Sequence, residues 1–301
     1  MFTKETTLII PTKNRYTLLI KTLKNLKSLK VKFDEIIVVD SSDIITHNKI
    51  KKISKQFSLK VYKSKPSSSL QRNIGLKKMN KKNKFLMLLD DDIIFQNNSF
   101  KNMNSNIISN QNKKIIGFAF CQKSKMENNF FEKLKNSKFS QILGLYSSKP
   151  GVVLRSGWHT KIYQKKENYF TDWLPTAATI FEKKYVTNLF DINFGQYSYL
   201  EDLDFSVSLK KNYNFLVVSS ALFIHKDEKI RNNFNFGYYE IINRCRFVKK
   251  NKLNFIYFYY ICFIKIFTNF LGILIRPISV QKCLGNLLGL FFTIKIIFSD
   301  K

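Results

Sequence analysis

The stretch Phe85-Leu86-Met87-Leu88-Leu89-Asp90-Asp91-Asp92 decides the fold of this chain. Its apolar residues form a continuous run, which is typical of a strand that is buried on both faces of a sheet. Three carboxylates follow that run directly. The sequence therefore predicts that an acidic triplet lies at one edge of a sheet.

The segments before this stretch alternate between strand and helix patterns. Residues 7–10 predict a strand, which we expect to stop at Pro11 because proline cannot donate a hydrogen bond to a ladder. A helix follows, since its apolar residues recur with the spacing of one packed face: Tyr16, Leu19, Ile20, Leu23 and Leu26. Further strands are expected at 35–39 and 59–62, and a further helix at 69–79. This alternation predicts a Rossmann-like, mostly parallel sheet flanked by helices.

Polar residues follow three of the predicted strands, at 11–15, 40–43 and 90–92. In open parallel sheets, ligands bind beyond the carboxyl ends of the strands. Adjacent carboxylates repel one another unless a cation or several donors neutralise them. Mg²⁺ and Mn²⁺ bind carboxylate oxygens and commonly bridge them to substrate phosphates. An acidic surface turn is the alternative, but the apolar strand directly before the triplet favours a metal site.

Four blocks resemble, in order and spacing, the nucleotide-binding blocks of family 2 glycosyltransferases, which have the GT-A fold. The blocks are Leu8-Ile9-Ile10-Pro11-Thr12-Lys13-Asn14-Arg15, Ile36-Ile37-Val38-Val39-Asp40, Gln71-Arg72-Asn73-Ile74-Gly75-Leu76 and Asp90-Asp91-Asp92. The family often has an Asn-Gly-Ser turn after its second strand, whereas this chain has Ser41-Ser42. The resemblance implies an inverting enzyme that uses a nucleoside-diphosphate sugar, UDP- or dTDP-linked, together with Mn²⁺ or Mg²⁺.

The resemblance also assigns the residues of the nucleotide-sugar site. They are Pro11, Thr12, Asn14, Arg15, Asp40, Arg72, Asn73, Asp90 and Asp91. By this resemblance Pro11, Thr12 and Arg15 border the base and ribose. Asp40 accepts a hydrogen bond from the base, and Arg72 lies near the base or the phosphates. Asp90 and Asp92 take the two acidic places of the DxD motif, with Asp92 as the direct metal ligand.

A second set of motifs resembles the acceptor half of the same family. Trp173 lies in a Trp-Leu block, in which Pro175-Thr176 replaces the usual glycine. The run 199–206 resembles the Glu-Asp-x-Asp motif, so Asp202 is the implied general base and Glu201 its neighbour. Acidic residues in the first turn of a helix are also favoured by the helix dipole, and that is the structural alternative. Asn212 takes the place of the glycine that usually ends this helix.

His225 follows an apolar strand at 221–224, where the family commonly has a histidine that completes the metal or diphosphate site. Farther along, Arg231 and Arg244 resemble residues of the rhamnosyltransferase-like branch, in which Arg231 would reach the diphosphate. His47 and His159 have no such counterpart, and a lone histidine is more often structural. The metal ligands implied are thus Asp92, Asp90 and His225, with Trp173, Glu201 and Arg231 at the acceptor or around the site.

The C-terminal tail contains two apolar segments, at 253–275 and 284–298. The first is long enough to cross a bilayer, but a lysine near its centre is costly there. Its polar and small residues fall on one narrow helical stripe: Asn254, Lys265, Asn269, Gly272 and Arg276. This pattern favours a helix lying in the membrane interface, although ordinary packing on the catalytic domain would also bury such helices.

Composition limits the class of protein. Lys and Arg number 51 against 21 Asp and Glu, giving a formal charge of +30 that favours nucleic acid, anionic lipid or nucleotide phosphates. The four isolated cysteines fit a reducing cytosolic setting, and no cleavable signal peptide is visible at the N-terminus. A basic nucleic-acid-binding protein and a nucleotidyltransferase of similar fold are the alternatives. The first leaves the acidic triplet unexplained, and the second normally begins with a glycine-rich phosphate loop.

The combined prediction is a GT-A catalytic domain over 1–245, with a nucleotide-sugar half (1–115) and an acceptor half (116–245). A membrane-associating helical tail follows at 246–301. The expected reaction is sugar transfer to a hydroxyl of a glycan or lipid-linked acceptor in surface polysaccharide synthesis. The expected location is the cytoplasmic face of a membrane, and nucleic acid is not an expected partner.

Overall fold

A computed structural model describes residues 1–123, 137–195, 198–210, 213–226, 232–273 and 279–298. The chain forms two compact units. The first comprises Met1–Lys125 and Ile162–Glu228, and the second comprises Met126–Lys161 and Lys229–Lys301. Helix α8 (Phe234–Lys250) belongs to the second unit, although most of it lies before residue 245. The domain boundary expected at residue 245 stays a prediction.

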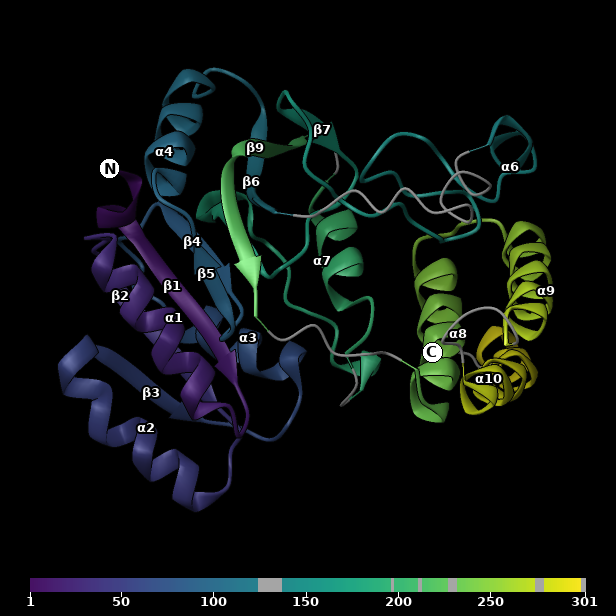
Figure 1. Ribbon diagram of the computed structural model, residues 1–301, viewed down its shortest axis with the longest axis horizontal. Coiled ribbons are helices and arrows are strands. Elements are labelled where there is room, and N and C mark those ends of the chain that lie inside the picture. Colours follow the sequence, from purple (N-terminus) through teal and green to yellow (C-terminus); the bar gives the residue numbers. More distant parts are fainter. Residues whose placement is uncertain (124–136, 196–197, 211–212, 227–231, 274–278, 299–301) are drawn as a thin grey trace. The chain divides into compact units, whose positions relative to one another are not determined.

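The first unit is built on a nine-stranded sheet with the order β3-β2-β1-β4-β8-β6-β9-β5, in which β7 pairs with β9 (Figure 1). Strands β1 to β4 are mutually parallel, and β6 and β9 share their direction, whereas β5, β7 and β8 run antiparallel to their neighbours. The strands are β1 (Thr6–Thr12), β2 (Glu35–Asp40), β3 (Leu59–Lys63), β4 (Phe85–Leu89), β5 (Ile93–Phe95), β6 (Ile115–Gln122), β7 (Tyr169–Thr171), β8 (Ala178–Glu182) and β9 (Asn214–His225). The mostly parallel α/β fold predicted from the sequence is confirmed.

Helices cover both faces of this sheet. On one face, α1 (Tyr16–Ser28), α2 (Ile44–Phe57) and α4 (Ser99–Ser109) pack against alternate strand residues such as Leu8, Ile10 and Met87. On the other face, α3 (Ser68–Lys78) and α7 (Glu201–Leu209) pack against the residues between them, such as Ile9 and Leu88. Strands β1, β2 and β4 are therefore buried on both faces, because successive side chains of a strand point to opposite faces. Short 3₁₀ helices lie at Phe2–Glu5, Lys183–Tyr185 and Ile192–Phe194.

Strand β1 does not stop at Pro11, so that expectation was wrong. Pro11 pairs in register with Val39 of β2, and the strand continues to Thr12. Pairing with β4 has already ended at Ile9, so β1 has only one neighbour at this point. Proline is tolerated where a strand is paired on one side only, since no second ladder needs its missing N–H.

The second unit is a helical bundle. Among the residues that the structure describes, its helices are α6 (Lys138–Ile142), α8 (Phe234–Lys250), α9 (Phe255–Gly272) and α10 (Val280–Phe298). Asn233 and Asn254 cap the starts of α8 and α9 by accepting from the backbone N–H groups of Phe236 (2.8 Å) and Tyr257 (3.0 Å). Trp158, Phe258 and Cys262 belong to the core of this bundle.

Glycines bring α8 and α10 into close contact. A Cβ atom added at Gly285 would lie 2.2 Å from the Phe234 carbonyl oxygen, and one added at Gly237 would lie 2.1 Å from that of Lys282. Such distances are shorter than van der Waals contact, so only glycine fits at both positions. Gly237 and Gly285 thus allow the close packing of α8 against α10.

Candidate active site

The polar segments that follow β1, β2 and β4 meet at one edge of the sheet, as their positions in the sequence predicted. The Thr12 hydroxyl donates to Asp91 Oδ2 at 2.6 Å, and the Asn14 N–H donates to Ser42 Oγ at 2.7 Å. Asn14 has a φ of 55°, a left-handed conformation that asparagine tolerates better than most residues. The 11–15 loop is therefore tied to both neighbouring segments.

Asp92 lies at the centre of a charged cluster. Its side chain is only 2% exposed, and its Oδ1 atom lies 2.8 Å from His225 Nε2. The antiparallel pairing of β5 with β9 places His225 there, because it stands opposite Ile93 in register. The Arg15 guanidinium also pairs with Asp92. Burial alone would raise the pKa of Asp92, but His225 and Arg15 hold it below its ordinary value, so Asp92 is an anion at neutral pH.

A potential metal site is formed by Asp90, Asp92 and His225. One ligand atom from each lies within 4.8 Å of the others. Two carboxylates and an imidazole form a donor set that suits a divalent cation. Asp90 is 30% exposed on its side chain, which leaves one side of this group open to a ligand. The residues therefore fit the Mn²⁺ or Mg²⁺ that the sequence implied.

Asp91, in contrast, points into the protein. Its carboxylate accepts from Thr12 and from Arg15 Nη1 (2.7 Å), and its backbone oxygen accepts from the Thr22 hydroxyl (2.9 Å). Burial raises the pKa of Asp91 to about 7, although Thr12 and Arg15 act to lower it. The middle acid of the triplet thus anchors the 11–15 loop.

Arg72 links Asp90 of the potential metal site to helix α7, which carries Asp202, the predicted general base. This buried side chain pairs with Asp90 Oδ1 at 2.9 Å through Nη2 and with Glu201 through Nη1. Glu201 also accepts from the Ser69 hydroxyl at 2.9 Å. Burial would lower the pKa of Arg72, but Glu201, Asp90 and Asp202 together raise it, so the guanidinium stays charged. The sequence placed Arg72 near the nucleotide, and in the structure it binds protein carboxylates.

Asp202 follows Glu201 in the first turn of α7 and is partly exposed. Its Oδ1 atom accepts from the N–H of Leu203 at 2.8 Å, and its charge acts on Arg72. Nearby, Ser206 exchanges hydrogen bonds with the backbone of Leu174, donating at 3.0 Å and accepting at 3.1 Å. That exchange fixes the segment that contains the buried Trp173 against α7.

Two predicted nucleotide ligands already have protein partners. Asp40 is fully buried, and its carboxylate accepts from Ser42 and lies 2.6 Å from His47 Nδ1. Asn73 exchanges two hydrogen bonds of 2.8 Å with the backbone of Phe190. Both side chains hold neighbouring segments in place. Arg231 and Asn212 lie outside the described residues.

The contacts of His47 and Gln71 in the site were not predicted from the sequence. His47, treated as an ordinary structural residue, is the partner of Asp40. Gln71 donates to the backbone oxygens of Thr12 (2.9 Å) and Val39 (2.7 Å) and so links two strand ends. A signal for His47 was present, because Asp43 caps a helix by accepting from Thr46 N–H at 2.8 Å. That helix, α2, was not predicted, and so its buried face was not identified.

The family model for glycosyl transferase family 2 matches residues 7–178, more than half of the chain. The chain belongs to this family. It is therefore a glycosyltransferase, and the matched residues include the strand ends and the acidic triplet described above. Among curated proteins, none matches the chain.

Several solved structures have a similar fold. S. aureus TarS, residues 1–349, has a TM-score of 0.56 and 14% identity, covering 97% of this chain and 81% of that chain. The mannosyltransferase PcManGT from Pyrobaculum calidifontis, in complex with GDP-Man and Mn²⁺, has a TM-score of 0.54 and 13% identity, covering 99% and 76%. GalNAc-T7 with UDP, GalNAc and Mn²⁺ has a TM-score of 0.53 and 15% identity, and there the match spans 74% of this chain but only 43% of that one. At such identities the likeness shows the GT-A fold.

Proposed function

We propose that this glycosyltransferase moves a sugar, with inversion, from a UDP- or dTDP-sugar to a hydroxyl of a glycan or lipid-linked acceptor in surface polysaccharide synthesis. The observation that carries the proposal is the continuous chain of charges from His225 through Asp92 and Asp90 to Arg72 and Glu201. Metal ligands and a helix bearing an acid are joined by a single buried guanidinium. Two structures of similar fold contain such ligands: the mannosyltransferase PcManGT with GDP-Man and Mn²⁺, and GalNAc-T7 with UDP, GalNAc and Mn²⁺. Their ligands support a nucleotide-sugar donor.

The donor's diphosphate belongs at the Asp90, Asp92 and His225 group in this proposal. Mn²⁺ or Mg²⁺ held there would neutralise charge on the departing nucleoside diphosphate. Arg15 already lies against Asp91 and Asp92, where its guanidinium adds positive charge beside the phosphates. In this proposal Pro11, Thr12 and Arg15 border the base and ribose, and Asp91 holds this segment in position.

Asp202 is the proposed general base. An acceptor hydroxyl must lose its proton as it attacks the sugar from the face opposite the leaving group, and a carboxylate can take that proton. Asp202 is suited to this role because it is partly exposed, whereas Glu201 beside it is buried and paired with Arg72. Arg72 thereby fixes the start of α7 relative to Asp90. Trp173, held against α7, is the proposed acceptor-side residue.

A screen of nucleotide sugars tests this proposal. We expect Mn²⁺- or Mg²⁺-dependent binding and slow hydrolysis of one UDP- or dTDP-sugar, with release of the nucleoside diphosphate. Release of pyrophosphate from a nucleoside triphosphate would instead indicate nucleotidyl transfer. Asp34→Asn is a suitable control for acidic-site variants, because Asp34 is exposed and lies just before β2, away from the carboxyl ends of the strands. Retention of metal-dependent binding in Asp92→Ala would show that the metal site is misplaced.

A further inference from the structure

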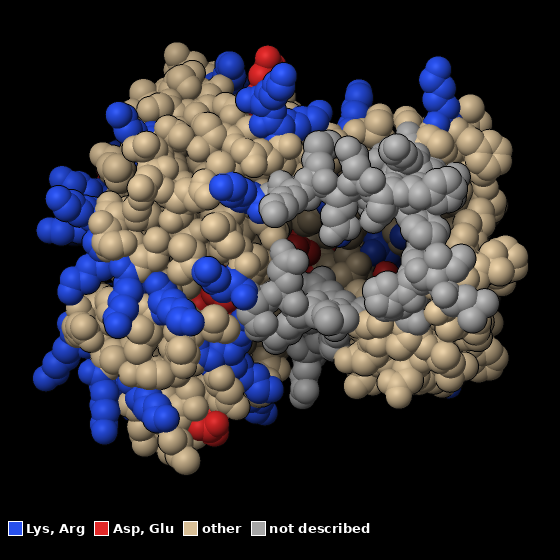
Figure 2. All heavy atoms as spheres, in the orientation of Figure 1, with Lys and Arg blue, Asp and Glu red and all other residues tan. Residues whose placement is uncertain are grey.

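Helices α9 and α10 expose a broad apolar surface. Among the most exposed side chains are Phe263 (63%), Phe267 (64%), Phe291 (67%) and Phe298 (81%). The other large exposed apolar residues of the two helices are Ile256, Tyr257, Tyr260, Phe270, Leu271, Val280, Leu284, Leu287, Leu288 and Ile294. Figure 2 accordingly shows few blue or red atoms over these helices, whereas Lys and Arg crowd the surface of the sheet unit. Soluble monomers rarely leave an apolar surface of this extent in water.

Several polar residues of these helices lie on the inward side. Asn286 and Thr293 of α10 are fully buried, and Asn286 donates to the Gly237 oxygen of α8 at 2.8 Å. The Lys265 ammonium of α9 lies 5.0 Å from the centre of the Trp158 ring. Of the stripe predicted on α9, Lys265, Asn269 and Gly272 thus lie on the side toward the bundle, whereas Asn254 is exposed and Arg276 lies outside the described residues. Each helix is long and apolar enough to cross a membrane, yet only 28% of its residues are buried in the protein.

Helix α8 argues against a membrane-crossing arrangement. It runs beside α10 along its length, from the Gly237 contact to the hydrogen bond that Lys249 Nζ donates to the Ile296 oxygen at 2.7 Å. Helix α8 carries Glu240, Arg244, Arg246, Lys249 and Lys250. If α9 and α10 crossed a bilayer, α8 would enter it with them, at a high cost for its partly exposed charges Arg246, Lys249 and Lys250.

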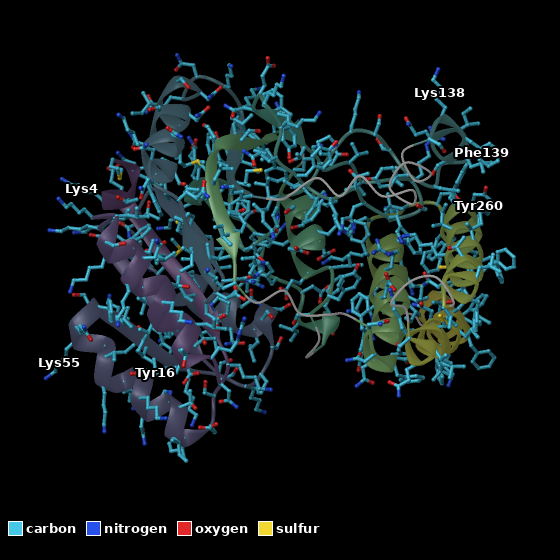
Figure 3. All side chains as sticks on the ribbon, in the orientation of Figure 1. Lys4, Tyr16, Lys55, Lys138, Phe139 and Tyr260 are labelled. Atoms are coloured by element: carbon cyan, nitrogen blue, oxygen red, sulfur yellow. The ribbon has the colours of Figure 1, made fainter. Side chains whose placement is uncertain are left out.

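The short helix α6 continues the apolar surface. Its Phe139 (69% exposed) and Ile142 (83%) belong to the same unit, and the following Gly144 lies near the Tyr257 ring of α9. In Figure 3, Phe139 and Tyr260 lie on the same side of this unit, with Lys138 projecting beside them. Exposed lysines flank the surface at Lys138 and at Lys295 near the end of α10. Cationic groups next to an apolar surface complement an anionic bilayer.

We propose that the outward faces of α9 and α10, with Phe139 and Ile142 of α6, embed in one leaflet of an anionic lipid bilayer. The chain is then held on one side of the membrane without crossing it. Lys265 and Asn269 of α9 face the bundle and not the headgroups. This membrane proposal rests on the proposed function only in placing the acceptor at the membrane. Its test measures lipid binding and does not depend on sugar transfer.

The first test is flotation of the purified full chain with vesicles of phosphatidylcholine, with and without phosphatidylglycerol. We expect flotation that increases with the anionic lipid and decreases with salt. Phe267→Glu and Phe291→Glu should each lower vesicle partitioning by about tenfold or more, since each removes a ring from the hydrocarbon. Ile108→Glu is the matched control, because Ile108 is 57% exposed on α4 of the other unit, and it should float like the parent. Circular dichroism would establish that each variant is folded.

A fluorescent reporter gives a second test. The two native tryptophans, Trp158 and Trp173, are buried (4% and 7% exposed), so their emission should change little on binding vesicles. Phe263→Trp should add an emission that shifts to shorter wavelength when vesicles are present. An unshifted emission, or parental flotation of both Glu variants, would overturn the proposal. A dimer of the parent chain in lipid-free buffer would also overturn it, if that dimer failed to float and Phe291→Glu converted it to a monomer. In that case a second copy of the chain would cover the surface.

Discussion

Helices α1 and α10 each have two chemically different faces, but they bury opposite ones. Helix α1 of the sheet unit buries Leu19, Leu23 and Leu26 and leaves its lysines exposed. Helix α10 of the bundle buries Asn286 and Thr293 along with small residues, and it exposes leucine and phenylalanine. Periodicity predicts that a helix has two different faces, but it does not say which face meets the solvent. The two units are therefore suited to different surroundings. The sheet unit suits water, and by our proposal the helical bundle suits lipid.

The largest expected effect lies in the sheet unit, where polar groups are placed for chemistry. We expect Asp202→Asn to lower turnover by about 10² to 10⁴, the usual contribution of a general base, while donor binding is retained. Turnover and donor affinity measured on the same preparation would separate these two effects. Asp34→Asn makes the same chemical change at an exposed site and should leave both quantities unaltered. Parental turnover in Asp202→Asn would remove the base from its assigned position.

The comparison of helices can be tested directly by removing the same side chain from each. Leu19 of α1 is fully buried, so Leu19→Ala should cost about 2 to 5 kcal/mol of unfolding free energy. Leu284 of α10 is 49% exposed, and Leu284→Ala should change stability in lipid-free buffer by less than about 1 kcal/mol. Denaturant unfolding followed by circular dichroism measures both. Equal destabilisation would show that the outward face of α10 is covered by protein in solution.

A smaller effect is expected at Glu35, a buried acid at the start of β2. It accepts from Thr7 Oγ1 (2.8 Å), Asn80 N (2.8 Å) and Lys60 Nζ (2.6 Å). Burial would raise the pKa of Glu35, but these partners lower it below the ordinary value of 4.5. Its contribution to stability is therefore fully present above that pH and is lost as pH falls through the lowered pKa.

Glu35→Gln should consequently lower the unfolding free energy at neutral pH by about 1 kcal/mol, the scale of one hydrogen bond. The difference between parent and variant should shrink as the pH is lowered below the ordinary value. Unfolding curves at several pH values would show this convergence. A constant difference down to acid pH would mean that the Glu35 charge contributes nothing.

The sequence predicted the sheet and the positions of its polar strand ends because apolar runs and parallel connections constrain both strongly. The strands at β2, β3 and β4 and the helices α1 and α3 form close to their expected residues. The continuation of β1 past Pro11 could not be predicted, since it depends on which neighbours a strand has at each residue. The inward orientation of Asp91 could not be predicted either, because the sequence does not distinguish it from Asp90 and Asp92. Its orientation depends on contacts with Thr12 and Arg15.

Side-chain partners were the other limit. Asp40 and Asn73 were identified from their blocks, but their pairing with His47 and Phe190 arises from contacts between distant segments. Lys265, Asn269 and Gly272 of the predicted α9 stripe share one side of the helix, whereas Asn254 is its exposed N-cap and Arg276 lies outside the described residues. The direction of that side depends on α8, which packs against α10, and on Trp158, which no helical wheel contains.

The most direct test of the central claim is the position of a metal ion. Crystals of the full chain grown with Mn²⁺ and a nucleoside diphosphate would reveal the ion by its anomalous scattering. We expect a peak in contact with Asp92, between Asp90 and His225, with the diphosphate bound to the same ion. An ion bound elsewhere, or a nucleotide that binds away from this edge of the sheet, would contradict it.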